Sequence, residues 1–552
     1  MIALFRMLYR YQGSALLTAE RRAAITHALL GAKYWNTEPG PDTCCWTTEN
    51  HQAMYHVGEL LAGQLWPDEH FRNDGRLGRA HREHARERLY RWLDWRMRLS
   101  FSEWNSAHYY DDDIAVLLNL HDYAEDATLR GQAARVLDQM FFELAVIHFR
   151  GTLPVTQGRA YDAEVRYPSQ TPVSILIRLV LLDTPVEELP ARLSRSAVVW
   201  CGSGYEVPQS IRDIAADPAP AVCRHRHSAN AEDAHRYGIF PDRVSDYGFF
   251  AGAGQGDNHL CVESGYILAN GEGHQYAYEY YKRCKAEGIP FDLDPHYIAL
   301  SEANLYIHKT PDTILSCAQD FRPGKPGFQQ HVWTAGLGDD CVVFSTNPAT
   351  GTPWGRPGLW HGNGIIPRVL QEKNVLLAFH RVRDYPIYDQ PPWYHDAYVH
   401  AYFPQALFDE VREVGPWVLG RRGRGFIALG SLMPWRWNGE RLERERPCEL
   451  IVDGLDAVFV CETGAGTPAD FEWFVRAVAA AEFAGGLDGM VYGSPSLGRV
   501  AAGWHAPLVV NNRPLQTGAY PRFDNPWARV PFGENPDVAT LCRTVRRGEA
   551  GA

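Results

Sequence analysis

The sequence predicts an α+β, multidomain protein in which a helical N-terminal domain, residues 1–230, precedes a large antiparallel β-sheet domain, residues 231–552. Two observations predict this division. Up to about residue 225, apolar residues recur at spacings of three and four, which is typical of helices with one buried face. After about residue 235, short β-branched and aromatic runs alternate with Gly, Pro, Asn and Asp, which is typical of strands joined by turns.

The helical pattern is clearest in the segment "ENHQAMYHVGELLAGQLW". It places Met54, Val57, Leu60, Leu61 and Leu65 on one face. The pattern continues in "RAHREHARERLYRWLDWRMRL", "DDIAVLLNLHDYAED", "LRGQAARVLDQMFFELAVIHF" and "PVSILIRLVLL", and Pro and Gly punctuate the gaps. Such helix pairs bury their apolar stripes either in a bundle or in a ring of hairpins.

The strand pattern runs through "DTILSCAQDF", "QQHVWTAGL", "CVVFSTNP", "NVLLAFHRV", "AYVHAYFP", "GFIALGSL", "CELIVDGLDAVFVCE" and "PLVVNN". Their spacing predicts a large antiparallel region of stacked sheets. One helical insert, "GEGHQYAYEYYKRCKAEG", interrupts this region. The polar segment "HRHSANAEDAHRYG" places the break near residue 230.

The composition narrows the function. A formal net charge of −12 argues against nucleic-acid and membrane partners. The 17 Trp and 27 Tyr supply flat side chains that stack on sugar rings as well as fill cores. No run reaches the roughly 20 apolar residues of a membrane span, and Arg6 and Arg10 interrupt any secretory signal. The eleven scattered cysteines fit reduced thiols, so we expect a cytoplasmic protein; its oligomeric state stays open.

The segment "WTTENHQA" concentrates polar side chains where a helix is expected to begin. Part of this concentration of polar residues is explained by helix capping. Thr47 or Thr48 can cap the helix, and Glu49 interacts favourably with the helix dipole. Capping does not require Asn50 and His51. These two residues are therefore candidates for a functional site.

A second polar group lies in "SEWNSAHYYDDDIAVLLNL". The acidic triplet after the two tyrosines can cap and charge the next helix. Loops on a rigid helical scaffold are also where reactive side chains are usually mounted. The candidates in this segment are Glu103, Asn105, His108, Tyr109, Tyr110 and Asp111 to Asp113.

An Asn-His pair that opens a helix, followed by a Tyr, in a helical domain that precedes a β-sheet domain, resembles the toroid-plus-β-sandwich polysaccharide lyases. This group includes heparinase II/III-like enzymes and exolytic alginate lyases. The matching residues are Asn50, His51 and either Tyr109 or Tyr110. The resemblance implies an N-terminal α/α toroid-like domain and a C-terminal β-sandwich. With only 49 residues before Asn50, the ring would be incomplete or closed differently.

The chemistry that the resemblance implies is β-elimination on a uronic acid within an acidic oligosaccharide or polysaccharide. Asn50 and His51 would neutralise the uronate carboxylate by hydrogen bonding, which acidifies the neighbouring C5 proton. Tyr109 or Tyr110 would remove that proton and protonate the departing O4, if its pKa is lowered from its usual value near 10. No cofactor is required for this reaction.

Further residues are candidates for contacting the substrate. The segment "GRAYDAE" resembles a substrate-contacting loop of the same toroid. In the β-sheet domain, "QQHVW" and "RPGLWHGNGIIPR" are the best candidates for completing the site, although both could equally be turns that hold a sheet together. The predicted substrate-binding residues are Glu49, His108, Arg159, Tyr161, His331 and His361, with Arg356, Trp360 and Asn363 beside the last of these.

Some of these lyases possess a structural divalent metal in the β domain, and the resemblance extends that expectation to this chain. The sequence does not assign its ligands. His259, His274 and His296 are spread too widely for a recognisable zinc spacing. His395 and His400 lie on an expected strand rather than on a helix face.

Two other functions remain open. An inverting glycoside hydrolase on a similar helical ring would use Glu49 as general acid and one of Asp111, Asp112 or Asp113 as base, because this chemistry needs two carboxylates. A carbohydrate-binding protein without turnover would use the aromatic side chains alone. The candidate catalytic residues of the hydrolase and those of the lyase lie in the same two segments of the sequence, so the sequence does not separate the two functions.

Overall fold

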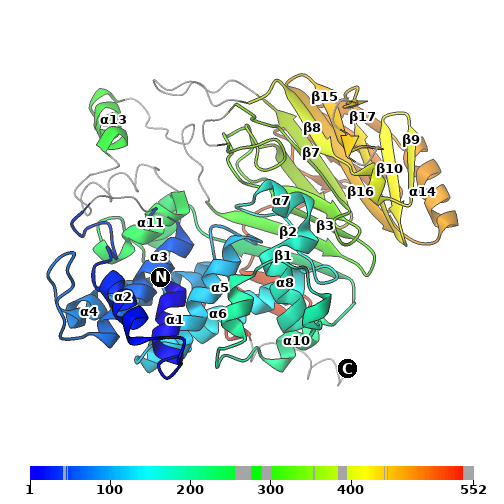
Figure 1. Cartoon of the computed structure of the whole chain (residues 1–552). Helices are drawn as coiled ribbons and strands as arrows, with labels where there is room; N and C mark the ends of the chain where they lie inside the picture. The colour runs from blue at the N-terminus through cyan, green and yellow to red at the C-terminus, as the bar shows by residue number, and fades with distance from the viewer. Residues whose placement is uncertain are drawn as a thin grey trace.

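A helical N-terminal region is followed by a large antiparallel β region, as the sequence predicts (Figure 1). The structure is a computed structural model, and it describes residues 1–40, 45–46, 48–254, 275–288, 301–351, 355–382, 395–439, 442–443 and 446–538. Within these residues the cysteines are thiols, and no helix combines the length and apolarity needed to cross a membrane.

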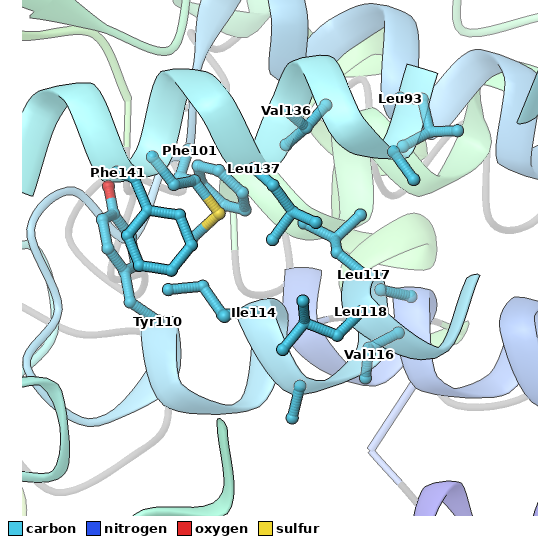
Figure 2. Close-up of a cluster of buried hydrophobic side chains, with 14 of the residues drawn as sticks. Leu93, Phe101, Tyr110, Ile114, Val116, Leu117, Leu118, Val136, Leu137 and Phe141 are labelled. Carbon is cyan, nitrogen blue, oxygen red and sulfur yellow. The ribbon is translucent and has the colours of Figure 1, made fainter. Parts of the chain in front are cut away.

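The helices of the N-terminal region share one apolar core. Figure 2 shows part of it, where Ile114 and Leu117 of α5 face Leu137 and Phe141 of α6. The longer helices are α1 (Ile2–Arg10), α2 (Ala19–Leu30), α3 (Glu49–Leu65), α4 (Gly78–Leu99), α5 (Tyr109–Tyr123) and α6 (Ala127–Ile147). The shorter ones are α7 (Asp162–Arg166), α8 (Pro172–Leu176), α9 (Arg195–Trp200), α10 (Gln209–Ala215) and α11 (Tyr247–Gly254).

The β region is built of antiparallel sheets. The ten-stranded sheet has the order β12-β15-β8-β5-β4-β3-β2-β1-β22-β23, and the six-stranded sheet has the order β6-β7-β16-β11-β10-β9. A five-stranded sheet, β17 to β21, and a short ribbon, β13-β14, complete the region. The predicted helical insert forms α13 (Gln275–Glu287).

The strands of the ten-stranded sheet are β1 (Ala221–His227), β2 (Ala303–Lys309), β3 (Ile314–Gln319), β4 (Trp333–Gly336), β5 (Val342–Thr346), β8 (Tyr398–Tyr402), β12 (Arg436–Trp437), β15 (Glu449–Asp453), β22 (Phe523–Asn525) and β23 (Ala528–Val530). Those of the six-stranded sheet are β6 (Arg368–Glu372), β7 (Val375–Arg381), β9 (Glu410–Val414), β10 (Trp417–Arg422), β11 (Gly425–Ser431) and β16 (Asp456–Ala465). The remaining strands are β13 (Leu442–Glu443), β14 (Arg446–Pro447), β17 (Phe483–Gly486), β18 (Gly489–Ser494), β19 (Gly498–Ala502), β20 (Val509–Val510) and β21 (Arg513–Pro514).

The six-stranded sheet is buried on both faces. Along β16, Phe459 and Cys461 enter the core shared with the ten-stranded sheet, whereas Val458 and Val460 enter a second core. The second core is completed by α14 (Pro468–Ala480) and the five-stranded sheet, and Figure 1 shows α14 beside β9 and β10. Because successive residues of a strand point to opposite faces, burial on both faces explains the unbroken apolar runs "NVLLAF" and "AVFVC".

Helix α14 was not predicted, although its start carries a recognisable signal. Thr467 and Asp470 form a capping box, in which each side chain accepts a hydrogen bond from the backbone of the other. The predicted boundary at residue 230 falls just after β1. Strand β1 pairs with β2 in the ten-stranded sheet, whereas Phe249 and Phe250 of α11 pack in the helical core. Segments on both sides of residue 230 therefore cross between the two regions.

A buried ionic group fastens the two regions together. The Glu143 carboxylate of α6 lies 2.6 Å from Nε2 of His227 and 3.3 Å from Nδ1 of His225, both on β1. Arg522, next to β22, lies 3.5 Å from the same carboxylate. The pKa of Glu143 is held well below its usual value: burial opposes ionisation, but His227 and Arg522 outweigh it.

Three buried histidines should make the stability of the folded protein depend on pH. Burial lowers the pKa of His148, His331 and His380 to about 3, against about 6.5 in an unfolded chain. Between these values the unfolded chain binds protons that the folded chain does not, so stability falls as the pH falls from about 6.5 to 3. We expect the thermal midpoint, followed by circular dichroism, to decrease steadily below about pH 6.5. His331→Leu should make that decrease shallower, whereas the exposed His27→Leu should not; equal slopes for both would contradict this assignment.

Candidate functional site

Two tyrosines and two arginines meet where the helical and β regions touch. The hydroxyl oxygens of Tyr109 and Tyr161 lie 2.6 Å apart. The guanidinium carbon of Arg159 lies 4.2 Å from the centre of the Tyr109 ring. Nη2 of Arg356 donates a hydrogen bond of 3.0 Å to the Tyr161 hydroxyl. We call these four residues the tyrosine–arginine cluster.

The cluster is assembled from three separate segments. Tyr109 is the first residue of α5, Arg159 and Tyr161 precede α7, and Arg356 lies between β5 and β6. Backbone hydrogen bonds fix the second segment against the β region, because Gln157 and His331 exchange bonds of 2.9 and 2.8 Å. The same segment packs tightly on the helical region at Gly158, where an added Cβ would lie 2.6 Å from the Trp104 ring.

Burial and charge set the protonation of the cluster. Nη1 of Arg159 pairs with Glu103 at 2.7 Å, and its Nε donates to Gln329. Burial raises the pKa of Glu103 despite this arginine. Burial also raises the pKa of Tyr109, and Arg159 only partly opposes that effect. The shift is opposite to the lowering expected from the sequence, so Tyr109 holds its proton at neutral pH.

The residues that open α3 reach the loop that carries Glu103, the partner of Arg159. The Glu49 carboxylate is buried, pairs with Arg96, and accepts hydrogen bonds of 3.0 and 2.9 Å from the backbone nitrogens of Ser102 and Glu103. It anchors the loop that carries Glu103, rather than merely interacting with the helix dipole. Thr48 occupies the N-cap position, but its hydroxyl makes no capping bond; Thr47 lies outside the described residues.

Asn50 and His51 lie beside this anchored loop. Asn50 is 1% exposed, and its Oδ1 has no hydrogen-bond partner among the residues that the structure describes. His51 is half-buried and donates from Nδ1 to the Cys45 carbonyl at 2.8 Å. Hydrogen bonding with Cys45, chiefly with its side chain, raises the pKa of His51 despite burial, and the charge of Glu103 contributes to the rise. His51 therefore lies within electrostatic range of the Glu103–Arg159 pair.

The structure separates the two adjacent tyrosines. Tyr110 is completely buried, and Figure 2 shows its ring among Phe101, Ile114 and Phe141. Its hydroxyl accepts a 3.1 Å hydrogen bond from the backbone nitrogen of Asn105. Only Tyr109 of the pair reaches the tyrosine–arginine cluster.

The acidic triplet is anchored inside the protein. Asp111 accepts hydrogen bonds from Ser194 and from the backbone at the start of α9, so it caps that helix rather than α5. Asp112 pairs with Arg195 at 2.9 Å. Both carboxyl oxygens of Asp113 lack a hydrogen-bond partner within the described part of the chain. The pKa of Asp113 lies well above its usual value, chiefly through burial and then through nearby carboxylates, so Asp113 is neutral.

The remaining predicted residues divide into two sets. His108 pairs with Glu164 at 3.3 Å, and its ring centre lies 5.1 Å from that of Tyr161. The ring of His361 lies 6.0 Å from Tyr161, so it borders the cluster together with Arg356. His331 instead packs edge-on against Phe344 in the core. Two others serve the scaffold: Trp360 stacks on His400, and Asn363 bonds the backbone at Asn347 and Gln330.

The sequence assigned no ligands to a metal in the β domain, and the two described histidines that it weighed, His395 and His400, have other partners. His400 uses both ring nitrogens, with Glu449 at 2.7 Å and Thr346 at 2.8 Å, and Nδ1 of His395 lies 3.5 Å from the neighbouring Asp396 carbonyl. His259, His274 and His296 lie outside the described residues. Within the described ranges, triads of metal-ligating side chains occur at Glu143-His225-His227 and Glu38-Glu59-His81, and neither lies in residues 231–552.

Neither protein-family models nor curated proteins match this chain. Its functional assignment therefore rests on the geometry of the site. Sequence reasoning nominated both tyrosines of the hydroxyl pair but gave Tyr161 only a binding role. It missed Glu164, and it gave no role to Glu103, although "SEWNSAHYY" places this acidic residue six positions before Tyr109.

Proposed function

We propose that the protein is a lyase that cleaves a uronic-acid-containing oligosaccharide or polysaccharide by β-elimination at the tyrosine–arginine cluster. In this proposal the helical region is an incomplete toroid and the β region a β-sandwich that closes over it. The observation that carries the proposal is the 2.6 Å contact between the Tyr109 and Tyr161 hydroxyls, flanked by two arginines. A positioned acid and base beside cations suit a reaction that develops negative charge next to a carboxylate.

The hydrogen bonds suggest separate roles for the two tyrosines. The Tyr161 oxygen accepts a hydrogen bond from the Arg356 guanidinium and shares the 2.6 Å hydrogen bond with the Tyr109 hydroxyl, in which either hydroxyl can be the donor. We therefore assign to Tyr161 the removal of the C5 proton. As the C4–O4 bond breaks and the C4=C5 double bond forms, the buried Tyr109 donates its proton to O4.

Three further side chains would neutralise the substrate carboxylate. Asn50 and His51 keep the role that the sequence suggested: the Asn50 side-chain amide nitrogen would donate to the carboxylate, and His51 is a partly exposed imidazole with a raised pKa. Arg356 adds a positive charge, since it has no carboxylate partner among the described residues. Arg159 differs, because Glu103 already compensates its charge.

An assay of the reaction products tests the proposal. The protein is incubated with a panel of uronate polymers and oligomers, and near-ultraviolet absorbance reports a C4=C5 double bond conjugated with the carboxylate. Absorbance that grows with time supports elimination. New reducing ends without absorbance identify the hydrolase, and binding without either product identifies a carbohydrate-binding protein; both outcomes overturn the proposal.

Replacing Arg356 should weaken substrate binding. Arg356→Gln removes the charge-assisted hydrogen bond that Arg356 would make to the substrate carboxylate. Such a bond contributes about 1.5 to 3 kcal/mol, so we expect KM to rise about 10- to 100-fold. Arg356→Lys keeps the charge and should recover part of this loss. The matched control is Arg529→Gln, whose side chain is 81% exposed on β23. An unchanged KM in Arg356→Gln would remove Arg356 from the site.

A further inference from the structure

A separate buried group of histidines and glutamates lies between α3 and α4. His56 and Glu59 are one turn apart on α3, in the half of the helix remote from Asn50, and His81 and His84 are one turn apart on α4. Glu38 joins them from the segment that precedes α3. We call these five residues the Glu–His cluster. The proposed lyase reaction makes no use of it.

The ligand-type atoms of Glu38, Glu59 and His81 all lie within 4.8 Å of one another, and His84 adjoins them through its contact with Glu59. Oε1 of Glu59 lies 2.8 Å from Nδ1 of His81 and 2.9 Å from Nδ1 of His84. Oε1 of Glu38 lies 3.9 Å from the same nitrogen of His81. Around a tetrahedral zinc ion, ligands at about 2.0 to 2.2 Å from the metal lie about 3.3 to 3.6 Å from one another. The observed separations bracket that range.

Outer hydrogen bonds hold these side chains in place. Nε2 of His81 lies 3.2 Å from Asp74, which reproduces the carboxylate–histidine arrangement that orients metal-bound imidazoles. Oε2 of Glu38 accepts bonds of 3.0 Å from the Tyr34 backbone and from the Asn73 amide, which leaves Oε1 directed at His81. Glu59 and His81 are completely buried.

His56 is the member of the Glu–His cluster whose polar atom is left unsatisfied. It is 3% exposed, and its Nδ1 has no hydrogen-bond partner in the part of the chain that the structure describes. It lies close enough to Glu59 and His84 for their charges to affect its pKa. An unsatisfied buried imidazole is costly unless a partner is supplied.

We propose that the Glu–His cluster binds one divalent transition-metal ion of the zinc type, with Glu38, Glu59, His81 and His84 as its ligands. Two imidazoles and two carboxylates are a common donor set for such ions. The ion replaces the protons on Nδ1 of both histidines and relieves the close approach of Glu38 to Glu59. Nη2 of Arg76 lies 3.4 Å from Glu38, and its 37% exposed side chain can turn into solvent when the ion binds.

Metal analysis tests this site without reference to catalysis. The full-length protein, purified without chelators and then dialysed against Zn²⁺, should contain one equivalent of zinc by mass spectrometry. Co²⁺ substituted for it should give the intense visible absorption of a four-coordinate site, and chelation should lower the thermal midpoint. Protein that takes up less than a tenth of an equivalent of Zn²⁺, Co²⁺ and Mn²⁺, with no shift of the midpoint, would show a metal-free ionic network and overturn the proposal.

Variants distinguish this site from adventitious binding. His84→Gln alters the most exposed ligand, at 18%, so the fold should tolerate it while the one equivalent is lost. Asp74→Asn removes the orienting carboxylate, together with its ion pair with Arg76, and should weaken affinity about 10- to 100-fold. The control His27→Gln, on the exposed face of α2, should keep full occupancy. Equal occupancy in His84→Gln and His27→Gln would refute the assignment.

Discussion

Tyr161→Phe and Tyr109→Phe should each lower turnover by about 10²- to 10⁴-fold, the usual contribution of a positioned acid or base. Each change removes one hydroxyl of the 2.6 Å pair and keeps the ring, so the cation contacts of Arg159 and Arg356 survive. Initial rates of absorbance growth on a uronate oligomer measure the effect. Because the two hydroxyls act together, the double variant should be scarcely slower than either single one.

Tyr110→Phe is the matched control for these variants. It removes a hydroxyl from the neighbouring ring, which lies in the helical core (Figure 2). The loss of the hydrogen bond from Asn105 should cost about 1 kcal/mol of unfolding free energy and leave turnover nearly unchanged. If Tyr110→Phe stops turnover while Tyr109→Phe and Tyr161→Phe remain active, the mechanism proposed above is wrong.

Glu49→Gln should reduce the free energy of unfolding by about 3 to 5 kcal/mol, because it leaves Arg96 as an uncompensated buried charge. The carboxylate is 1% exposed and also accepts two backbone hydrogen bonds, which the neutral amide can satisfy only in part. Denaturant titration measures the change. Glu83→Gln breaks surface pairs with Arg82 and Arg86 and should cost less than about 1 kcal/mol.

The same variant separates the structural role of Glu49 from a catalytic one. The sequence suggested only a dipole contribution of about 0.3 to 1 kcal/mol, and therefore a mild effect. The pairing with Arg96 replaces that expectation. A Glu49→Gln protein of unchanged stability that has lost all activity would instead favour the inverting hydrolase.

Periodicity predicted most of the elements but not the way in which they join. The helix at residues 49–65 shows a helical periodicity, and strands such as β3, β7, β11 and β16 show short apolar runs between turn residues, so each was predicted from its own segment. Strand β1 was not predicted, because its inward-facing residues include the polar His225 and His227. These two side chains are buried because they pair with Glu143, which also lies beside Arg522. Such partners lie far along the chain, beyond the reach of a local pattern.

The candidate site was predicted in its residue types more than in its geometry. The sequence could not separate Tyr109 from Tyr110, because both belong to one short segment. A helix turns neighbouring residues by about 100°, and this rotation sends one ring to the cluster and the other to the core. The contact between Tyr161 and Arg356 spans 195 residues, so only the folded chain reveals it.

The pairing of β1 with β22 has a consequence for how the chain is made. His225 and Asn525, which bond across these two strands, are separated by 300 residues. During synthesis the helical region emerges first, but Phe523, Trp527 and Val530, which complete its core, leave the ribosome much later. Until then Glu143 lacks Arg522, and the edge of β1 is open to other strands. We therefore expect the nascent helical region to expose apolar surface that chaperones bind, and to acquire its final stability only when the last strands arrive.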